Sequence, residues 1–359
     1  MTAPARILSA ATALPRHYAD QETLVAEFRA LWGEKHFNLD RLEQLFKAVR
    51  VGGRHLALPV EEYRSLTSFS ARNTAWTRVA TELAEVVLRK ALDRAGLRPD
   101  QLDHVFFTTV TGIAAPSIEA RLIDRVGLRP DLKRTPLFGL GCVAGAAGIA
   151  RAADYLRGFP GQRAALIAVE LCSLTLQRED LSVANIIASG LFGDGAACVV
   201  LGPASPGHDG PAAPAGPEVL ATRSVFYPGT ERVMGWDIVD SGFKIVLSSR
   251  VPELVLARIR GDVDGFLSAQ GLQRSDLRHF VCHPGGPKVL EAFEQALEIP
   301  RAAVQRTWDS LQQVGNLSSA SVLFVLRDLL ESGAAKPGDK GLLLAMGPGF
   351  CSELVLLQW

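Results

Sequence analysis

Short apolar runs alternate along the chain with longer segments that have helical periodicity or are rich in alanine. Five runs have the length and composition of buried strands, namely 164–169, 196–201, 280–282, 341–346 and 352–358. Helices are predicted to begin close to residues 142, 288 and 317. Strands that alternate with helices predict mostly parallel sheets covered by helices.

The order of these elements repeats along the chain. The segment 96–104, at the entry to one strand, is matched at the same spacing by the segment 271–279, with glycine, leucine and histidine at equivalent places. Gly141-Cys142 and Gly315-Asn316 then precede equivalent helices, and two more apolar strands follow in each half. Four matched elements in one order indicate an internal duplication. We therefore expect a duplicated α/β fold of five layers, αβαβα, in which two sheets enclose shared central helices.

Two segments of unusual composition support this organisation. Residues 144–150 consist of alanine, glycine and one isoleucine. Glycine weakens an exposed helix, so a helix of such small residues is expected at the centre, where other elements pack closely on all sides. Residues 202–217 are almost entirely glycine, proline and alanine, which favours a loop. We place this loop between an N-terminal half, 1–201, and a C-terminal half, 218–359.

Length and charge narrow the class of protein. A chain of 359 residues is long enough for two domains, or one double domain, with a sizeable core. Its 38 lysine and arginine residues balance 38 aspartate and glutamate residues, so no broad positive field is available to hold nucleic acid or an anionic membrane. An anionic ligand must therefore meet a local group of cations.

The cysteines and the start of the sequence indicate the compartment. The five cysteines show no Cys-x-x-Cys spacing, so neither a disulfide framework nor a metal site is predicted. The first residues lack the pattern of a signal peptide, and no apolar run approaches the ~18 residues of a membrane span. We expect a cytoplasmic protein with no membrane span.

Three side chains have the chemistry of acyl transfer. Cys142 precedes a helix, where unpaired backbone amides favour the thiolate, although a free cysteine is more often a small buried hydrophobe. His283 ends a strand and is followed by a rigid turn that leads to Pro287 at the first position of a helix. Asn316 takes the place of Cys142 in the second half, where its ordinary role is an N-cap. Because the duplication brings these groups together, they suit catalysis through a covalent thioester.

Five motifs in one order carry a resemblance to a known family. They are Gly-Cys-Val-Ala-Gly at 141–145, Leu-Phe-Gly-Asp-Gly-Ala-Ala at 191–197, His-Pro-Gly-Gly-Pro at 283–287, Gly-Asn-Leu-Ser-Ser-Ala at 315–320 and Gly-Pro-Gly at 347–349. With these motifs the chain resembles, over nearly its whole length, the type III polyketide synthases, which form the chalcone synthase-like branch of the thiolase fold.

The resemblance implies a mechanism and a set of roles. Cys142 would attack a starter acyl-CoA, and His283 would keep its sulfur as the thiolate. His283 and Asn316 would stabilise the enolate formed when malonyl-CoA loses carbon dioxide. Phe192 would be the gatekeeping residue beside the malonyl carboxylate. The resemblance also implies a homodimer and no cofactor, with CoA thioesters as the substrates.

The resemblance also assigns binding residues. Gly347, Pro348 and Gly349 would shape the cyclisation cavity. The family binds the CoA phosphates with basic residues in the segment that here reads 47–54, so Arg50 and Arg54 are candidates. Lys288, near a helix N-terminus, is a third candidate cation. The match is loose, because glycines replace some of the family's basic residues, and a solvated surface charge is the ordinary alternative for each cation.

Departures from the plant chalcone synthases bear on the product. Ala115, Cys172, Trp236 and Ile245 replace a methionine, a threonine, a glycine and a phenylalanine that line or border the elongation cavity. The chain is in this respect similar to the bacterial branch. We expect a medium or long acyl-CoA starter, malonyl-CoA as extender, and release as an alkylpyrone or alkylresorcinol. Cys172 keeps open the alternative of a tetrahydroxynaphthalene synthase that uses malonyl-CoA alone.

Two other classes remain as alternatives. A ketoacyl-ACP synthase III also uses Cys, His and Asn in a duplicated fold, but its histidine is typically followed by Gln-Ala-Asn, whereas Pro-Gly-Gly-Pro follows His283 here. A binding subunit without activity would not need a complete set of Cys142, His283 and Asn316. Carrier-independent turnover of malonyl-CoA distinguishes the polyketide synthase from both.

Overall fold

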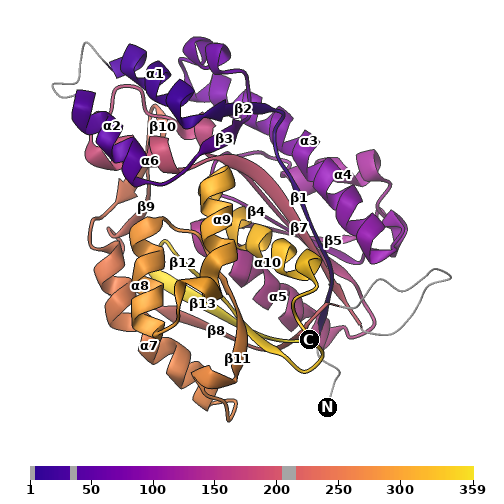
Figure 1. Ribbon diagram of the computed structural model, residues 1–359. Helices are drawn as coiled ribbons and strands as arrows, with labels where there is room; N and C mark the ends of the chain where they lie inside the picture. The colour runs from indigo at the N-terminus through magenta and orange to yellow at the C-terminus, as the bar shows by residue number, and fades with distance from the viewer. Residues whose placement is uncertain (1–4, 33–38, 204–215) are drawn as a thin grey trace.

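The computed structural model describes residues 5–32, 39–203 and 216–359, and in this part of the chain nine strands form the main sheet (Figure 1). Their order is β11-β12-β13-β8-β1-β7-β6-β4-β5. The N-terminal half supplies β1 (Arg6–Ala13), β4 (His104–Thr109), β5 (Lys133–Phe138), β6 (Ala164–Leu171) and β7 (Asp194–Gly202). The C-terminal half supplies β8 (Glu218–Phe226), β11 (Leu277–Cys282), β12 (Lys340–Gly347) and β13 (Cys351–Gln358).

Helices cover both halves of this sheet and separate them. The outer layer on the N-terminal strands contains α3 (Phe69–Ala95) and α4 (Ile118–Val126). The outer layer on the C-terminal strands contains α7 (Val251–Ser268), α8 (Pro287–Leu297) and α9 (Gln305–Val314). Between the half-sheets lie α5 (Ala144–Gly158) and α10 (Ser321–Ser332), as Figure 1 shows. The predicted five-layered αβαβα arrangement is confirmed.

The strands differ from the prediction in two respects. The two expected sheets are continuous, because β1 and β8 are paired at Arg6 and Glu218. The half-sheets are also mixed rather than mostly parallel. In the C-terminal half, for example, β11 and β12 are parallel, but β13 is antiparallel to both β12 and β8. Only a short turn separates β12 from β13, and so short a connection permits an antiparallel pair alone.

The central helix α5 is packed as its composition predicts. Its first seven residues, Ala144–Ala150, are all buried. A Cβ on Gly145 would lie 2.3 Å from the carbonyl oxygen of Ser319, and a Cβ on Gly148 would lie 2.4 Å from Leu166. Small residues are therefore required here, because the strands and α10 approach the helix backbone directly.

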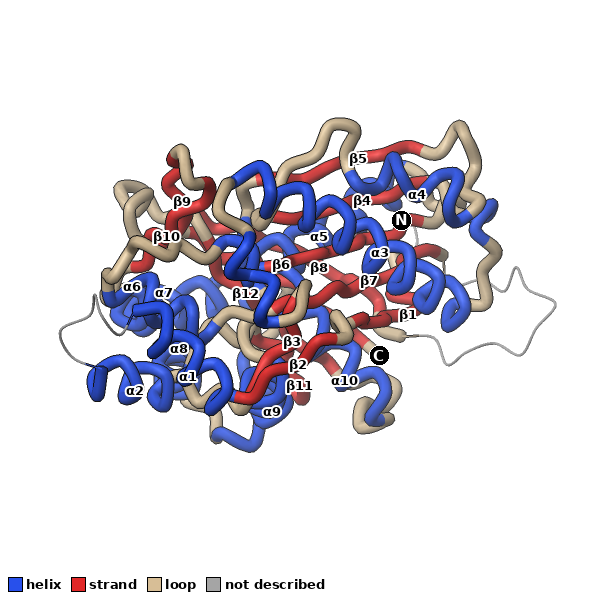
Figure 2. The backbone as a smooth tube through the Cα atoms, turned by 90° about the horizontal axis from the view of Figure 1, so that it is seen from above, coloured by secondary structure: helices blue, strands red, loops and turns tan. Residues whose placement is uncertain are grey.

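Smaller elements gather beyond one end of the central layer (Figure 2). The helices are α1 (Gln21–Trp32), α2 (Leu39–Ala48) and α6 (Val183–Leu191). Two antiparallel pairs of strands accompany them: β2 (His17–Asp20) with β3 (Gly53–Leu56), and β9 (Met234–Val239) with β10 (Gly242–Leu247). Short 3-10 turns carry several site residues: η1 (Val60–Ser65), η3 (Gly141–Val143), η4 (Cys172–Thr175) and η7 (Ser318–Ala320). The remaining turns are η2 (Pro99–Gln101), η5 (Arg274–Asp276) and η6 (Arg301–Val304).

Helix ends follow local sequence signals. The side chain of Ser68 accepts a hydrogen bond from the amide of Ala71 at the start of α3, and Gly96 ends that helix in the left-handed conformation. Pro287 is the first residue of α8, as predicted. Most of the predicted loop 202–217 lies outside the described residues, so the division of the chain at that loop stays a prediction. None of the described helices is long and apolar enough to cross a membrane.

Candidate active site

Cys142 lies in η3, immediately before the central helix α5, and is buried. Its thiol lies 3.8 Å from the hydroxyl oxygen of Ser318, in the equivalent turn before α10. The duplication thus places the two helix starts side by side, as expected. Both turns are buried between the half-sheets, where a covalent intermediate is shielded from water.

Asn316 connects the Cys142 turn to the turn that follows His283. Its side-chain oxygen accepts a hydrogen bond of 2.8 Å from the amide of Ser318, and its side-chain nitrogen donates one of 3.4 Å to the carbonyl of Gly285. Its amide group also lowers the pKa of the Cys142 thiol by hydrogen bonding. Asn316 is therefore not the N-cap that its position suggested, because Leu317 and Ala320 occupy the N-cap positions of η7 and α10. Its bond to the amide two residues later is an Asx-type turn.

His283 lies at the carboxyl end of β11, and its backbone amide donates to the carbonyl of Leu344 on the neighbouring strand at 2.8 Å. The ring is buried, yet both ring nitrogens lack a partner in the described part of the chain. Burial lowers the pKa of His283 to about 3, so the imidazole is neutral at physiological pH. A neutral imidazole offers one N–H donor, which suits it to hold a developing oxyanion.

The ionisation state of Cys142 differs from the prediction. Burial raises the pKa of the thiol to about 12, and the charge of Glu170 adds to this, although Ser318 and Asn316 oppose it. The helix start alone does not stabilise a thiolate here, because the surrounding protein excludes the water that would solvate it. Without substrate, Cys142 is therefore held as the neutral thiol.

A stability measurement tests the protonation state of His283. Its pKa in the folded protein is depressed below the value of about 6.5 expected in the unfolded chain, so the unfolded state binds the extra proton. Between about pH 6.5 and 4 the wild type should lose ~1.4 kcal/mol of unfolding free energy per pH unit more than His283→Asn. Urea unfolding at several pH values measures this difference. Parallel pH profiles for the two proteins would show that His283 is not buried in its neutral form.

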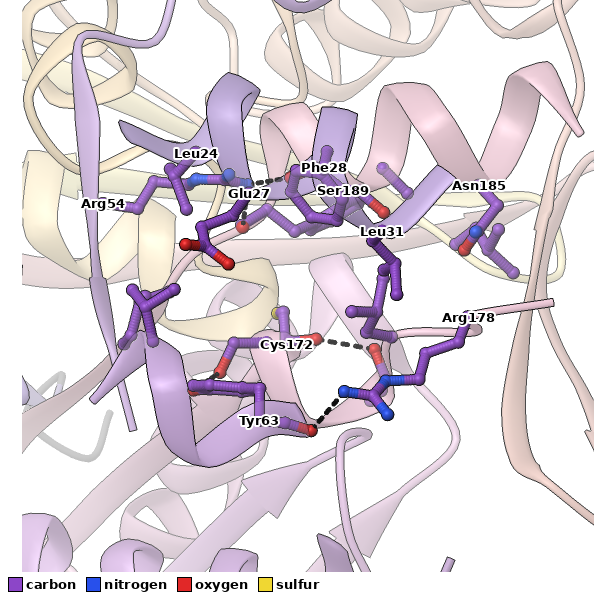
Figure 3. Close-up of a pocket in the computed structure, with 18 of the residues that line it drawn as sticks. Leu24, Glu27, Phe28, Leu31, Arg54, Tyr63, Cys172, Arg178, Asn185 and Ser189 are labelled. Atoms are coloured by element: carbon purple, nitrogen blue, oxygen red, sulfur yellow. Dashed lines mark hydrogen bonds between the residues drawn. The ribbon is translucent and has the colours of Figure 1, made fainter. Parts of the chain in front are cut away.

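A pocket of about 430 Å³, shown in Figure 3, is bordered by Phe192, whose backbone is bridged to that of Asn316. Cys142, His283 and Asn316 themselves are not among the residues that line it. Its lining combines five of the predicted residues: Phe192, the cavity candidates Cys172, Trp236 and Ile245, and Arg54, which was predicted as a CoA cation. Trp236 and Ile245 are cross-strand partners in the β9–β10 hairpin, so their side chains share one face. Most of the remaining wall is apolar and comes from α1, η1 and α6. The pocket can hold an elongated apolar group.

The Gly347-Pro348-Gly349 turn packs against the turn that contains Cys142 and is not among the residues that line the pocket. Its role in shaping the cyclisation cavity stays a prediction. A Cβ on Gly347 would lie 2.7 Å from the amide nitrogen of Val143, and one on Gly141 would lie 2.7 Å from the ring of Pro348. The turn therefore fixes the backbone on either side of Cys142. Ala115 also lies outside the pocket, in an exposed segment.

The three predicted CoA cations differ in their surroundings. Arg50 and Lys288 are exposed, and Arg50 forms an ion pair of 3.5 Å with Glu291. Arg54 is only 3% exposed, and its guanidinium donates to the backbone carbonyls of Ser189 and Phe192. The structure thus corrects the prediction for Arg54, because a guanidinium engaged in this way inside the protein is not presented to a phosphate at the surface.

The sequence reasoning missed two parts of the site. The α1 residues Leu24, Phe28 and Leu31 form a wall of the pocket, and their helical spacing within 21–32 was a signal that could have been read. Glu170 is completely buried behind Cys142 and accepts hydrogen bonds of 3.0 Å from both the amide of Val110 and the hydroxyl of Thr111. Among the described residues, no cluster of His, Cys, Asp and Glu has the composition of a metal site.

Comparison with known proteins agrees with this geometry. The family model of chalcone and stilbene synthases, N-terminal domain, matches residues 1–206, and the C-terminal domain model matches residues 218–359. A 1,3,6,8-tetrahydroxynaphthalene synthase of Streptomyces peucetius subsp. caesius is 49% identical over 97% of this chain and 91% of that protein. A putative chalcone synthase of Bacillus subtilis is 36% identical over 98% of both chains.

The fold is equally similar to a solved structure. The 1,3,6,8-tetrahydroxynaphthalene synthase of Streptomyces coelicolor A3(2), a bacterial type III polyketide synthase, superposes with a TM-score of 0.91. The two sequences are 31% identical, and the match covers 99% of each chain. The chain therefore belongs to the chalcone and stilbene synthase family, and it is an acyltransferase of the type III polyketide synthase class.

Proposed function

We propose that the protein extends an acyl chain, held as a thioester on Cys142, by decarboxylative condensation with malonyl-CoA. The observation that carries this proposal is the continuous set of contacts from the Cys142 thiol through Ser318 and Asn316 to Gly285, next to His283. A nucleophile, a neutral imidazole and an amide donor are thereby held together in one buried site.

Cys142 and His283 each act in more than one step of the cycle. Cys142 loses its proton to His283 and attacks the acyl-CoA carbonyl, so a new C–S bond forms and CoA leaves as the thiol, which takes up the proton. Malonyl-CoA then loses carbon dioxide, and the electron pair of the broken C–C bond becomes the enolate of acetyl-CoA. The N–H groups of His283 and Asn316 hold the enolate oxygen. The enolate carbon attacks the acyl thioester, a C–C bond forms as the C–S bond breaks, and Cys142 leaves as the thiolate, which takes up a proton from water before the next cycle.

Phe192 and the pocket that it lines would determine where the growing chain extends. Phe192 lines the pocket and is joined to Asn316 by an isolated bridge between their backbones. An apolar ring beside the malonyl carboxylate favours its conversion to neutral carbon dioxide. The pocket beyond it is walled by Cys172, Trp236 and Ile245 and by the apolar face of α1. We propose that it takes a medium or long acyl chain, which leads to an alkylpyrone or alkylresorcinol.

A second product is favoured by a separate observation. The relatives in Streptomyces peucetius and Streptomyces coelicolor are named 1,3,6,8-tetrahydroxynaphthalene synthases. An enzyme of that kind would build its chain from malonyl-CoA alone, and a pocket of about 430 Å³ also has room for a folded polyketide. The two candidates share the chemistry at Cys142 and differ in the starter and in the rings that are closed.

Product analysis across starters decides between these candidates. We expect mass spectrometry to show pyrones or resorcinols whose mass follows the length of the acyl-CoA supplied with malonyl-CoA. A naphthalene formed from malonyl-CoA alone, with no starter incorporated, would favour the second candidate. Turnover only in the presence of an acyl carrier protein would instead point to a ketoacyl synthase III-like reaction.

A matched pair of variants on α6 tests whether the pocket holds the starter. Ala188 lines the pocket, whereas Val183 on the same helix is exposed and does not. Ala188→Phe should shift the preferred starter to shorter chains. It should also lower kcat/KM for the longest starter by about tenfold, which is the smallest effect expected when an apolar site loses room for one methylene group. Val183→Phe should leave the starter profile unchanged. Equal profiles for both variants would place the acyl chain elsewhere.

The remaining assignments follow from the surface. Arg50 and Lys288 are exposed cations that we propose as contacts for the CoA phosphates, with Lys288 in the first turn of α8.

We also propose a cytoplasmic homodimer. It is supported by β5, which ends the main sheet, and by the apolar side chain of Phe138 on that strand, which is 56% exposed. A second copy that covers this edge would protect the free edge of β5 and bury the Phe138 side chain.

A further inference from the structure

Arg54 is a buried cation whose partners lie far away in sequence. It sits on the short strand β3, and its exposed fraction is 3%. Burial lowers the pKa of its guanidinium to about 10, so the group is still charged at neutral pH. A buried charge is costly unless it is paired and hydrogen-bonded. Its position therefore calls for a reason within the fold.

The guanidinium of Arg54 forms hydrogen bonds at the carboxyl end of α6. Its Nη1 donates to the carbonyl of Ser189 and, at 2.9 Å, to the carbonyl of Phe192. Figure 3 shows Arg54 extended along the pocket toward Ser189. The last carbonyls of a helix lack intrahelical partners and carry partial negative charge, so a cation at this end stabilises them. Arg54 thus fixes the backbone from which the Phe192 ring enters the pocket.

The side-chain stem of Arg54 packs on a second functional segment. A Cβ on either Gly193 or Gly315 would lie 3.4 Å from the Arg54 Cγ, so the stem covers both glycine backbones. These backbones meet at the bridge between Phe192 and Asn316, where the amide of Gly193 donates to the carbonyl of Asn316 at 2.9 Å. Arg54 therefore packs against the backbone contact between the N-terminal and C-terminal halves at the site.

A buried carboxylate completes this arrangement. Asp194 attracts Arg54 electrostatically and raises the pKa of its guanidinium against the effect of burial. Asp194 itself accepts hydrogen bonds from the amides of Ala57, at 2.6 Å, and Ser173, at 2.8 Å. Ser173 follows Cys172 in η4. Asp194, the first residue of β7, thus joins η4 to the segment that follows β3, while Arg54 joins β3 to the end of α6.

We propose that Arg54 is a positioning residue that sets Phe192 and Asn316 in register with each other and with Cys142. This inference rests on the proposed roles of those three residues. A displacement of about 1 Å at a catalytic group can cost on the order of a hundredfold in rate. Because the guanidinium is not presented to solvent, its loss should affect the chemical step rather than the binding of CoA.

Two readouts separate this role from binding of the CoA phosphates. Arg54→Lys keeps the charge and one donor group, whereas Arg54→Met removes both. We expect Arg54→Met to lower kcat by about a hundredfold with KM for malonyl-CoA changed less than about threefold, and Arg54→Lys to recover part of kcat. Calorimetric titration with free CoA should give the same Kd for wild type and Arg54→Lys. Arg50→Met is the comparison and should weaken CoA binding.

The outcomes remain distinct even where a variant folds poorly. Arg54→Lys is the milder change, and its melting temperature verifies that the protein is folded. A tenfold weaker Kd for CoA in Arg54→Lys, with kcat intact, would overturn the positioning role and restore Arg54 as a phosphate ligand. Failure of the proposed function would be visible separately, as a wild type that binds CoA but does not decarboxylate malonyl-CoA.

Discussion

The Cys142→Ala variant should lose polyketide formation by about a thousandfold or more, because removal of a covalent nucleophile leaves no position for the acyl chain. The same variant should still decarboxylate malonyl-CoA. His283 and Asn316, which we propose to hold the enolate oxygen, come from other turns of the fold and do not depend on the sulfur. Product formation and carbon dioxide release, measured in parallel, test both halves of this expectation.

A matched control removes a thiol that has no role in the site. Cys198 is completely buried in β7, where burial alone raises its pKa. Cys198→Ala should retain product formation and lose only a small amount of stability, because it leaves a cavity of about one sulfur atom. If Cys142→Ala formed the product at the rate of Cys198→Ala, the assignment of the nucleophile would be wrong.

The Gly145→Ala variant should show the second large effect, on both stability and activity. A Cβ at this position would lie 2.3 Å from the Ser319 carbonyl oxygen and 2.7 Å from a methyl carbon of Val322. The substitution must therefore push α5 away from η7 and α10. Overpacking of this kind costs about 1–3 kcal/mol. Because η7 contains Ser318, the neighbour of Cys142, we also expect kcat to fall by at least about tenfold through misplacement of the site.

Gly158, at the end of the same helix, provides the control. A Cβ there would have no heavy atom within 4 Å. Gly158→Ala should be neutral, or stabilising by up to about 1 kcal/mol, since alanine has the higher helix propensity. Urea unfolding and product formation should separate the two variants clearly. Equal stability and activity for Gly145→Ala and wild type would show that the central helices are not packed as tightly as described.

Much of the architecture could be predicted because it follows local signals. Strands such as β6 and β12 are buried apolar runs, and the alanine and glycine content of α5 indicates a central helix. Strand direction could not be predicted in the same way. The antiparallel neighbours β12 and β13 arise from a short turn, and the pairing of β1 with β8 joins residues that are far apart in sequence. Hydrophobic pattern does not encode such partners.

The residues of the candidate site also differ in how far the sequence predicts their positions. The convergence of Cys142 and Asn316 follows from the internal duplication, and the predicted place of His283 follows from its strand and turn. The burial of Arg54 does not follow from its neighbours, because its carbonyl partners belong to α6, more than a hundred positions later in the chain. The Gly347-Pro348-Gly349 turn was assigned to the cavity by resemblance, whereas its close contacts are with the turn that contains Cys142.

The ionisation of the site shows why a motif alone is insufficient. A cysteine before a helix is expected to be a thiolate when the amides and a nearby cation outweigh desolvation. Here burial dominates for both partners, since it raises the pKa of Cys142 to about 12 and lowers the pKa of His283 to about 3. Without substrate, both groups are therefore held in their neutral forms.

The most direct test is the mass of the protein after incubation with an acyl-CoA and no malonyl-CoA. The wild type should gain the mass of one acyl group, and proteolysis should place it on the peptide that contains Cys142. The Cys142→Ala protein should gain none. A wild type without added mass would contradict the covalent mechanism, and an acyl group carried by another cysteine such as Cys172 would contradict the assignment of Cys142 as the nucleophile.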